Sequence, residues 1–178
     1  MNKRTIGWDE YQGLVSKICR DISITGWRPD YIVGITRGGL LPAKMISYYL
    51  DVPCETLKVS LRDHVETESN CWMAEDAFGH EVYDAMASGS GKKNILIVDD
   101  INDTGATLNW LMEDWQESCF PSDERWKDEI WNNNVKFAVL FDNLASDCKV
   151  TMDFVGEEVN KAENNAWIDF PYEDWWTK

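Results

Sequence analysis

Residues 94–107 read NILIVDDINDTGAT, and this stretch decides the fold. The apolar, β-branched run at 95–98 indicates a buried strand. It ends in two adjacent carboxylates, Asp99 and Asp100, and the small residues 104–107 then lead into a helical pattern. A strand, an acidic edge, a small-residue loop and a helix, in this order, are typical of a phosphate site at the carboxyl end of a parallel strand.

The length and composition of the chain limit the class of protein. The chain has 178 residues, of which 44% are hydrophobic, so one folded domain spanning 1–178 is expected. No run approaches the roughly 18 apolar residues of a membrane helix, and residues 1–5 do not lead into a signal-peptide core. A cytoplasmic protein is therefore expected.

The cysteines are scattered without a C-x-x-C pair, which favours reduced thiols over a zinc site or a disulfide framework.

The net charge of −15 limits the possible ligands. Binding to nucleic acid needs clustered Lys and Arg, so nucleic-acid partners are not expected. A phosphate ligand on so anionic a chain needs backbone amides, local cations or a metal ion. The carboxylates of Asp99 and Asp100 make Mg²⁺ the expected cofactor.

The rest of the chain alternates between strand and helix patterns. Helices are predicted over 8–24, 40–50 and 123–131 and after residue 107, and strands over 31–36, 56–61, 94–99 and 136–141. This order predicts an α/β fold with a mainly parallel central sheet flanked by helices. The polar range 62–93, with some helix near 82–86, is expected to be a mobile lid or a solvated insertion. The aromatic-rich tail 153–178 is expected to form a small C-terminal hood.

The run 94–107 allows three interpretations. A Walker-B strand needs a partner G-x-x-x-x-G-K-[ST], and a Rossmann site needs G-x-G-x-x-G, and this sequence has neither. The whole run 94–107 instead resembles the phosphoribosyl-pyrophosphate (PRPP) motif of type I phosphoribosyltransferases. The resemblance implies that the ribose 5-phosphate is bound by Thr104, Gly105, Ala106 and Thr107. It also implies that Asp103 belongs to the PRPP-binding residues and is the candidate general base.

The same resemblance assigns the acid pair. Asp99 and Asp100 would bind the ribose hydroxyls directly or through Mg²⁺, with Asp100 the stronger candidate for the metal contact. A second match, ITRGGLLP at 35–42, resembles the family's pyrophosphate loop. It implies that the amides of Arg37 and Gly38 face the pyrophosphate. The Thr36–Arg37 bond matches the position where some members have a cis peptide.

A third set of matches resembles the bacterial xanthine-guanine branch of the family. GWD at 7–9, LRDH at 61–64 and AWIDFP at 166–171 carry it. The resemblance implies that Trp167 stacks on a purine and that Ile168 offers backbone groups to its edge. The alternative for Trp167 is a place in the hydrophobic core.

One position departs from the family pattern. The purine enzymes place a Lys just after the strand that matches 137–141, where this chain has Asp142 and Asn143. Asn143 is predicted to contact the base through its amide, which both donates and accepts hydrogen bonds. The function expected is transfer of phosphoribosyl from PRPP to hypoxanthine, guanine or xanthine in nucleotide salvage, by a homo-oligomer (a dimer or tetramer). A transferase for a pyrimidine or unusual base, and a non-catalytic regulator that senses PRPP or a nucleotide, remain alternatives.

Overall fold

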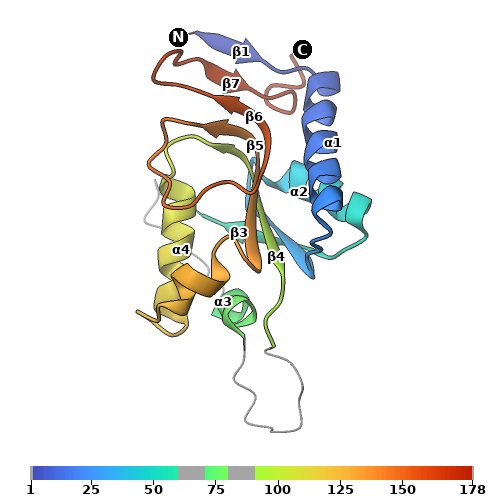
Figure 1. Cartoon of the computed structure of the whole chain (residues 1–178). Coiled ribbons are helices and arrows are strands. Elements are labelled where there is room, and N and C mark those ends of the chain that lie inside the picture. Colours follow the sequence, from blue (N-terminus) through green and yellow to red (C-terminus); the bar gives the residue numbers. More distant parts are fainter. Residues whose placement is uncertain (1, 60–70, 80–90, 178) are drawn as a thin grey trace, which may run out of the picture.

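A five-stranded parallel sheet forms the centre of the molecule (Figure 1). The computed structural model describes residues 2–59, 71–79 and 91–177. The strands, in the spatial order β3-β2-β4-β5-β6, are β3 (Cys54–Lys58), β2 (Tyr31–Thr36), β4 (Ile95–Asn102), β5 (Val135–Asn143) and β6 (Phe154–Val159). The predicted α/β class and parallel sheet are confirmed.

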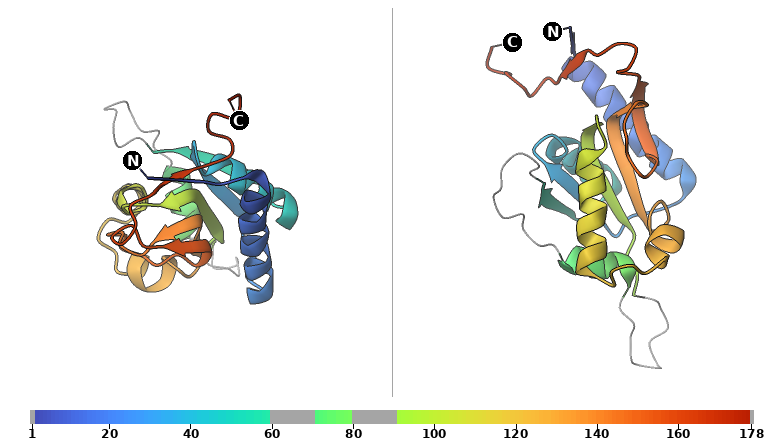
Figure 2. Two further views of the ribbon diagram at one scale, coloured as in Figure 1. Left: turned by 90° about the horizontal axis from the view of Figure 1, so that it is seen from above. Right: turned by 90° about the vertical axis from the view of Figure 1, so that its left-hand side faces the viewer.

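Helices cover both faces of this sheet (Figure 2). They are α1 (Trp8–Thr25), α2 (Leu40–Leu50), α3 (Cys71–Phe78), α4 (Ala106–Ser118) and the π-helical turn η1 (Trp126–Ile130). Side chains of β4 alternate between the two faces. Ile95 and Ile97 pack with α3, α4 and η1, whereas Leu96 and Val98 pack with α1 and α2. None of the described helices is long and apolar enough to cross a membrane.

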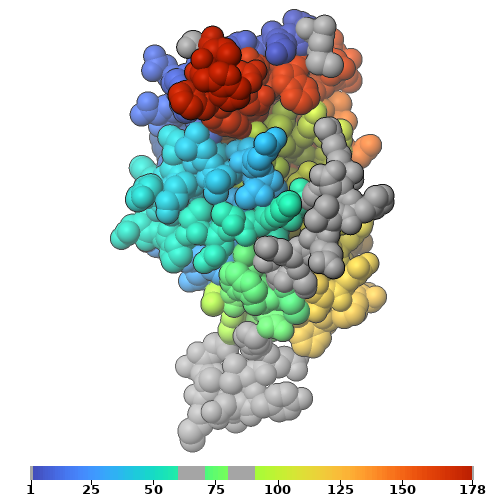
Figure 3. Space-filling view, turned by 180° about the vertical axis from the view of Figure 1, so that it is seen from behind, coloured from blue at the N-terminus to red at the C-terminus, as the bar shows by residue number. Residues whose placement is uncertain are grey.

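A second, two-stranded sheet forms the hood. The strand β1 (Lys3–Thr5) pairs in parallel with β7 (Trp167–Asp169), with Arg4 opposite Ile168. Seen from above, the N- and C-terminal segments lie close together at this end of the molecule (Figure 2). In the space-filling view the C-terminal residues sit beside the N-terminal segment at the same end (Figure 3).

The expected hood therefore needs correction. Residues 154–159 form β6, an edge strand of the central sheet, and the hood recruits β1 from the start of the sequence instead. Both β1 and β7 are three residues long. Such short strands carry almost no periodic signal, and they form here because they pair with each other across the chain.

Several predicted elements differ in length from the observed ones. The strand β2 and the helix α2 have the predicted bounds. In contrast, β4 continues through Asn102 and β5 through Asn143, so their polar ends lie within paired strands. The strand β3 begins at Cys54 and ends at Lys58, earlier than predicted, and η1 lies inside the predicted helix 123–131.

Helix α3 was not predicted, because acidic and polar neighbours surround its four buried apolar side chains. Its Asp76 is 7% exposed and accepts a hydrogen bond from the Tyr31 hydroxyl at 3.1 Å. Lys93 forms an ion pair with Asp76 at 3.1 Å. Residues 71–78 are thus fixed to the amino end of β2, whereas 60–70 and 80–90, including the helix expected near 82–86, lie outside the described residues.

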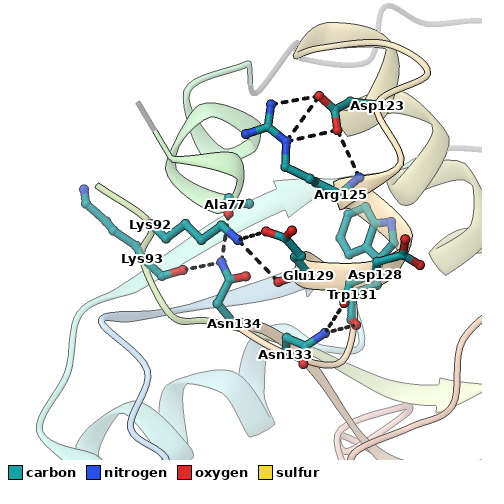
Figure 4. Close-up of polar contacts among 10 residues, drawn as sticks. All are labelled: Ala77, Lys92, Lys93, Asp123, Arg125, Asp128, Glu129, Trp131, Asn133 and Asn134. Carbon is teal, nitrogen blue, oxygen red and sulfur yellow. Dashed lines mark hydrogen bonds and ion pairs between the residues drawn. The ribbon is translucent and has the colours of Figure 1, made fainter. Parts of the chain in front are cut away.

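Polar contacts join the segment before β4 to η1 and β5 (Figure 4). The Asn134 amide donates to the carbonyl oxygens of Ala77 and Lys93 at 2.8 and 2.9 Å. The Lys92 ammonium lies 3.4 Å from a Glu129 carboxylate oxygen. These contacts lie at the amino end of the sheet, so they leave the carboxyl edge free to carry a site.

Candidate active site

Asp100 lies at the centre of the carboxyl edge of the sheet. Its carboxylate packs directly on the loop after β2, since a Cβ added to Gly38 would lie 2.0 Å from Asp100 Oδ2. The Tyr172 hydroxyl donates to the same oxygen at 2.7 Å. The Thr36–Arg37 peptide bond is cis, as the sequence resemblance predicted. The fold thus brings Arg37 and Gly38 together with the acid pair.

Tyr172 is a site residue that sequence analysis missed. Its ring stacks on Phe170 with centroids 5.4 Å apart and an interplanar angle of 3°. Burial and the nearby Asp100 charge raise the pKa of Tyr172, so its hydroxyl remains a donor at neutral pH. The only sequence signal was the density of aromatic residues in the tail, which indicated docking but no partner.

Asp99 has a different environment from its neighbour. It is 9% exposed, and its Oδ1 accepts a hydrogen bond from the Asp100 backbone N–H at 2.9 Å. Burial and the charge of Asp100 raise the pKa of Asp99 well above its usual range. Asp100 lines two hollows whereas Asp99 lines one, so Asp100 is the better placed of the two carboxylates to meet a cation.

The raised pKa of Asp99 predicts how stability depends on pH. A carboxyl with a raised pKa in the folded state binds its proton more tightly there, so ionising it at higher pH costs stability. In the absence of Mg²⁺, Asp99→Asn should therefore raise the melting temperature at pH 8 and leave it nearly unchanged near pH 4. Thermal unfolding followed by circular dichroism across this range measures the difference. Parallel curves for the two proteins would contradict the prediction.

The loop 103–107 forms a compact turn at the start of α4. Gly105 adopts φ 85°, and a Cβ there would lie 2.4 Å from the Cys148 backbone nitrogen, so the position requires glycine. The Asp147 N–H donates to the Thr104 carbonyl at 3.1 Å, and Asn109 Nδ2 donates to the Asp147 carbonyl at 2.9 Å. The segment after β5 thus holds the loop in place.

Two adjoining hollows open at this edge. The smaller, of about 200 Å³, is lined by residues 99–108, including Thr104, Ala106 and Thr107. Its small size, backbone lining and position at a helix N-terminus suit a phosphate group. The larger, of about 610 Å³, is lined by Arg37, Gly38, Asp100, Trp167, Tyr172, Glu173, Asp174 and Trp176. Because Asp100 lines both, the three sequence motifs meet around one carboxylate.

The polar end of β5 is occupied by internal contacts. Asn143 is 6% exposed and its Nδ2 donates to the Asp103 carbonyl at 2.7 Å. Its Oδ1 accepts from the backbone N–H groups of Ala145 and Lys161 at 3.2 and 2.9 Å. These contacts account for the side-chain oxygen and one amide hydrogen, so the geometry favours a loop-positioning role for Asn143 over the predicted contact with a base.

Asp142 is the other residue at the position where this chain departs from the family pattern. Its side chain also makes an internal hydrogen bond. Its Oδ1 accepts a hydrogen bond from Asn102 Nδ2 at 2.8 Å. Asn102 Nδ2 donates as well to Ser146 Oγ at 3.0 Å. Asp142 therefore joins the ends of β4 and β5 to the following turn.

Lys161 approaches the site from the tail 153–178, in which the sequence predicted only Trp167 and Ile168 as site residues. Its Nζ lies 2.8 Å from Asp103 Oδ1, and its side chain is 12% exposed whereas that of Asp103 is 42% exposed. Lys161 follows β6, far along the chain from Asp103, and no spacing in the sequence signals their contact. The candidate general base therefore has a cationic partner.

Trp167 lies on the surface of the hood, with 45% of its area exposed. A core position is therefore wrong, and its ring is available at the wall of the larger hollow. Ile168 has a buried side chain. Trp167 donates its N–H to Asn2 and Asp169 accepts from Ile6, so both face β1 through their backbones. Since backbone groups alternate along a strand, those of Ile168 point away from β1.

The exposure of Trp167 allows a clean substitution test. Trp167→Ala should raise the KM for a stacked base about tenfold, because base–aromatic stacking contributes about 1–3 kcal/mol. Trp72→Ala is a matched control, since Trp72 is also 45% exposed but lies on α3 at the other end of the sheet. Steady-state kinetics and melting temperatures of both variants check the prediction. An unchanged KM with a lower melting temperature would assign Trp167 a structural role.

The fold and the site together indicate a class of protein. A parallel sheet with an acid pair and a phosphate-sized loop at its carboxyl edge, under a hood, is suited to a sugar phosphate. The phosphoribosyl transferase domain model matches residues 7–175, and the chain belongs to this family.

Curated relatives and solved structures agree with this assignment. The xanthine-guanine phosphoribosyltransferase of Idiomarina loihiensis is 24% identical over 169 residues, covering 94% of this chain and 85% of that protein. The enzyme of the same name from Cereibacter sphaeroides is 33% identical over 116 residues, covering 58% and 59%. The structure of a purine phosphoribosyltransferase from Pyrococcus horikoshii superposes with a TM-score of 0.64 at 22% identity, covering 98% and 96%.

Proposed function

We propose that this protein transfers the phosphoribosyl group of PRPP to a purine base, with hypoxanthine, guanine or xanthine as the acceptor. A ring nitrogen of the base attacks C1 of the sugar, the bond from C1 to pyrophosphate breaks, and the products are a nucleoside monophosphate and pyrophosphate. The observation that carries this proposal is the meeting of the pyrophosphate-loop residues Arg37 and Gly38, Asp100 and Trp167 around one hollow.

Each part of the site has a role in this reaction. The amides and hydroxyls of residues 104–107 bind the 5-phosphate. Arg37 and the neighbouring amides hold the pyrophosphate, and Trp167 and the backbone of Ile168 orient the base. Asp103 accepts the proton that the base releases. Catalysis then comes from positioning and from stabilising charge on the departing pyrophosphate.

The donor set fits a Mg²⁺ ion that arrives with PRPP. Among the described residues, no group of three or more His, Cys, Asp or Glu side chains is arranged to hold a metal ion by itself. Mg²⁺ commonly uses one or two carboxylates together with substrate phosphates, and Asp100, followed by Asp99, would supply them. When bound, the ion offsets negative charge on the leaving pyrophosphate.

A panel of bases tests the proposal. The protein is incubated with PRPP, Mg²⁺ and one base at a time, and pyrophosphate release is measured. We expect release with at least one of hypoxanthine, guanine and xanthine. Release only with orotate or uracil would indicate a pyrimidine transferase. Tight PRPP or nucleotide binding without release for any base would indicate the sensing regulator.

We also propose that the protein works in the cytoplasm as a dimer or tetramer. The side chains of Tyr48 and Tyr49, on the outer surface of α2, are 78% and 59% exposed, and aromatic residues are enriched at interfaces. The cysteines are free thiols, which suits a reducing compartment. Light scattering on the purified chain measures the mass, and a monomer at micromolar concentration would contradict the oligomer.

A further inference from the structure

The ion pair between Lys161 and Asp103 places a donor and an acceptor side by side. Lys161 Nζ and Asp103 Oδ1 are 2.8 Å apart. An ammonium has three hydrogens and no acceptor, whereas a carboxylate has acceptors only. The stem of Lys161 is largely buried, and Asp103 is more exposed. The pair therefore offers a ligand two adjacent and opposite hydrogen-bonding functions.

Asn143 fixes the backbone of both partners. Its Nδ2 donates to the Asp103 carbonyl at 2.7 Å and its Oδ1 accepts from the Lys161 N–H at 2.9 Å. A single buried side chain thus joins the phosphate loop to the segment after β6. This clamp makes the Lys161–Asp103 contact part of the built site, unlike an exposed ion pair whose long side chains are free to move.

The ammonium also lies over the ring of Trp167, the candidate stacking residue. Lys161 Nζ is 6.0 Å from the centroid of the Trp167 ring, at the outer limit of a cation–π contact. Asp103 is therefore its closer partner. A flat base bound against Trp167 would meet the ammonium and the carboxylate together.

Purine edges differ in what they present to such a pair. Guanine carries O6 beside N7, and adenine carries an amino group beside N7. Hypoxanthine and xanthine also carry an oxygen at carbon 6. When N7 bears a hydrogen, a 6-oxopurine matches the pair in order: its oxygen faces the ammonium and its N–H faces the carboxylate. The amino group of adenine would instead place donors against a group that cannot accept.

We infer that Lys161 is the specificity-determining residue of the base pocket, donating a hydrogen bond to the 6-oxo group of the purine while Asp103 faces its N7. This inference rests on the proposed function and deepens it. It assigns to the segment after β6 the base contact that the sequence pattern had assigned to Asn143. Discrimination follows because a site built to bond an oxygen leaves its donor unpaired against the wrong base.

Equilibrium binding of two nucleotides tests the inference without requiring turnover. Inosine and adenosine 5′-monophosphate differ in the oxo or amino group at carbon 6. We expect the wild type to bind the inosine nucleotide at least about tenfold more tightly by calorimetry, a difference of about 1.4 kcal/mol. Lys161→Gln should bring the two affinities within about threefold, because the amide both donates and accepts. Lys161→Arg, which keeps a cationic donor, should retain most of the preference.

The control and the contrary outcomes are equally specific. Lys17→Gln removes the Lys17–Asp21 ion pair on α1 and should leave the affinity ratio unchanged. Three results would overturn the inference. They are an unchanged affinity ratio in Lys161→Gln, an equal loss of affinity for both nucleotides, and no binding of either nucleotide by the wild type. If no base supports pyrophosphate release but the ratio responds to Lys161, the proposed function fails and the assignment of Lys161 stands.

Discussion

Asp103→Asn is expected to lower kcat by about 10²–10⁴-fold, the usual contribution of a positioned general base. An amide has nearly the shape of the carboxylate but does not take up the proton of the base. The affinity for PRPP should change little, because the Asn143 amide holds the Asp103 backbone carbonyl and keeps the loop in place. Single-turnover kinetics and PRPP binding measure the two effects separately.

The control for this substitution lies in the segment that supports the same loop. Asp147→Asn also removes a negative charge nearby, but Asp147 holds the loop through its backbone N–H and carbonyl, which the substitution leaves unchanged. Its turnover should stay close to that of the wild type. Comparable losses in the two variants would show that local charge, rather than proton transfer at Asp103, sets the rate.

Gly38→Ala is expected to raise the KM for PRPP at least about tenfold, with a melting temperature close to that of the wild type. The added methyl would lie 2.0 Å from Asp100 Oδ2, so the carboxylate has to turn away. This rotation breaks its 2.7 Å hydrogen bond from Tyr172 and withdraws it from the hollow. A tenfold change corresponds to about 1.4 kcal/mol of lost binding.

Two other glycines separate this local effect from general destabilisation. A Cβ on Gly39 would lie 2.3 Å from the Val98 carbonyl oxygen, a backbone atom, so Gly39→Ala should lower the melting temperature markedly. Gly13, within α1, has no heavy atom within 4 Å of its added Cβ, and Gly13→Ala should stabilise the fold slightly. A normal KM in Gly38→Ala would show that Asp100 does not contact the sugar phosphate or its metal.

The sequence predicted the elements whose signals are local. The strand β2 and the helix α2 have the predicted bounds, because a buried β-branched run and a helical spacing are each readable within a dozen residues. The acid pair at the end of β4 and the cis bond at Thr36–Arg37 were also predicted, since each belongs to a contiguous motif.

The missed features depend on contacts between distant segments. The strands β1 and β7 form because they pair with each other, and neither has enough residues to show a pattern alone. Lys161 reaches Asp103 only because β6 lies next to β5 in the sheet. The internal contacts of Asn143 could not be predicted for the same reason, since its partners come from two separate loops.

The pairing of β1 with β7 has a consequence for synthesis on the ribosome. The strands β2 and β4 and the loop 103–107 leave the ribosome well before Trp167. A nascent chain, or one truncated before residue 167, would thus carry the proposed sugar-phosphate site without Trp167 and Ile168, the proposed contacts for a base. Residues 3–5 emerge long before their strand partner, β7. If the proposed function holds, the growing chain therefore acquires base selection only after sugar-phosphate binding.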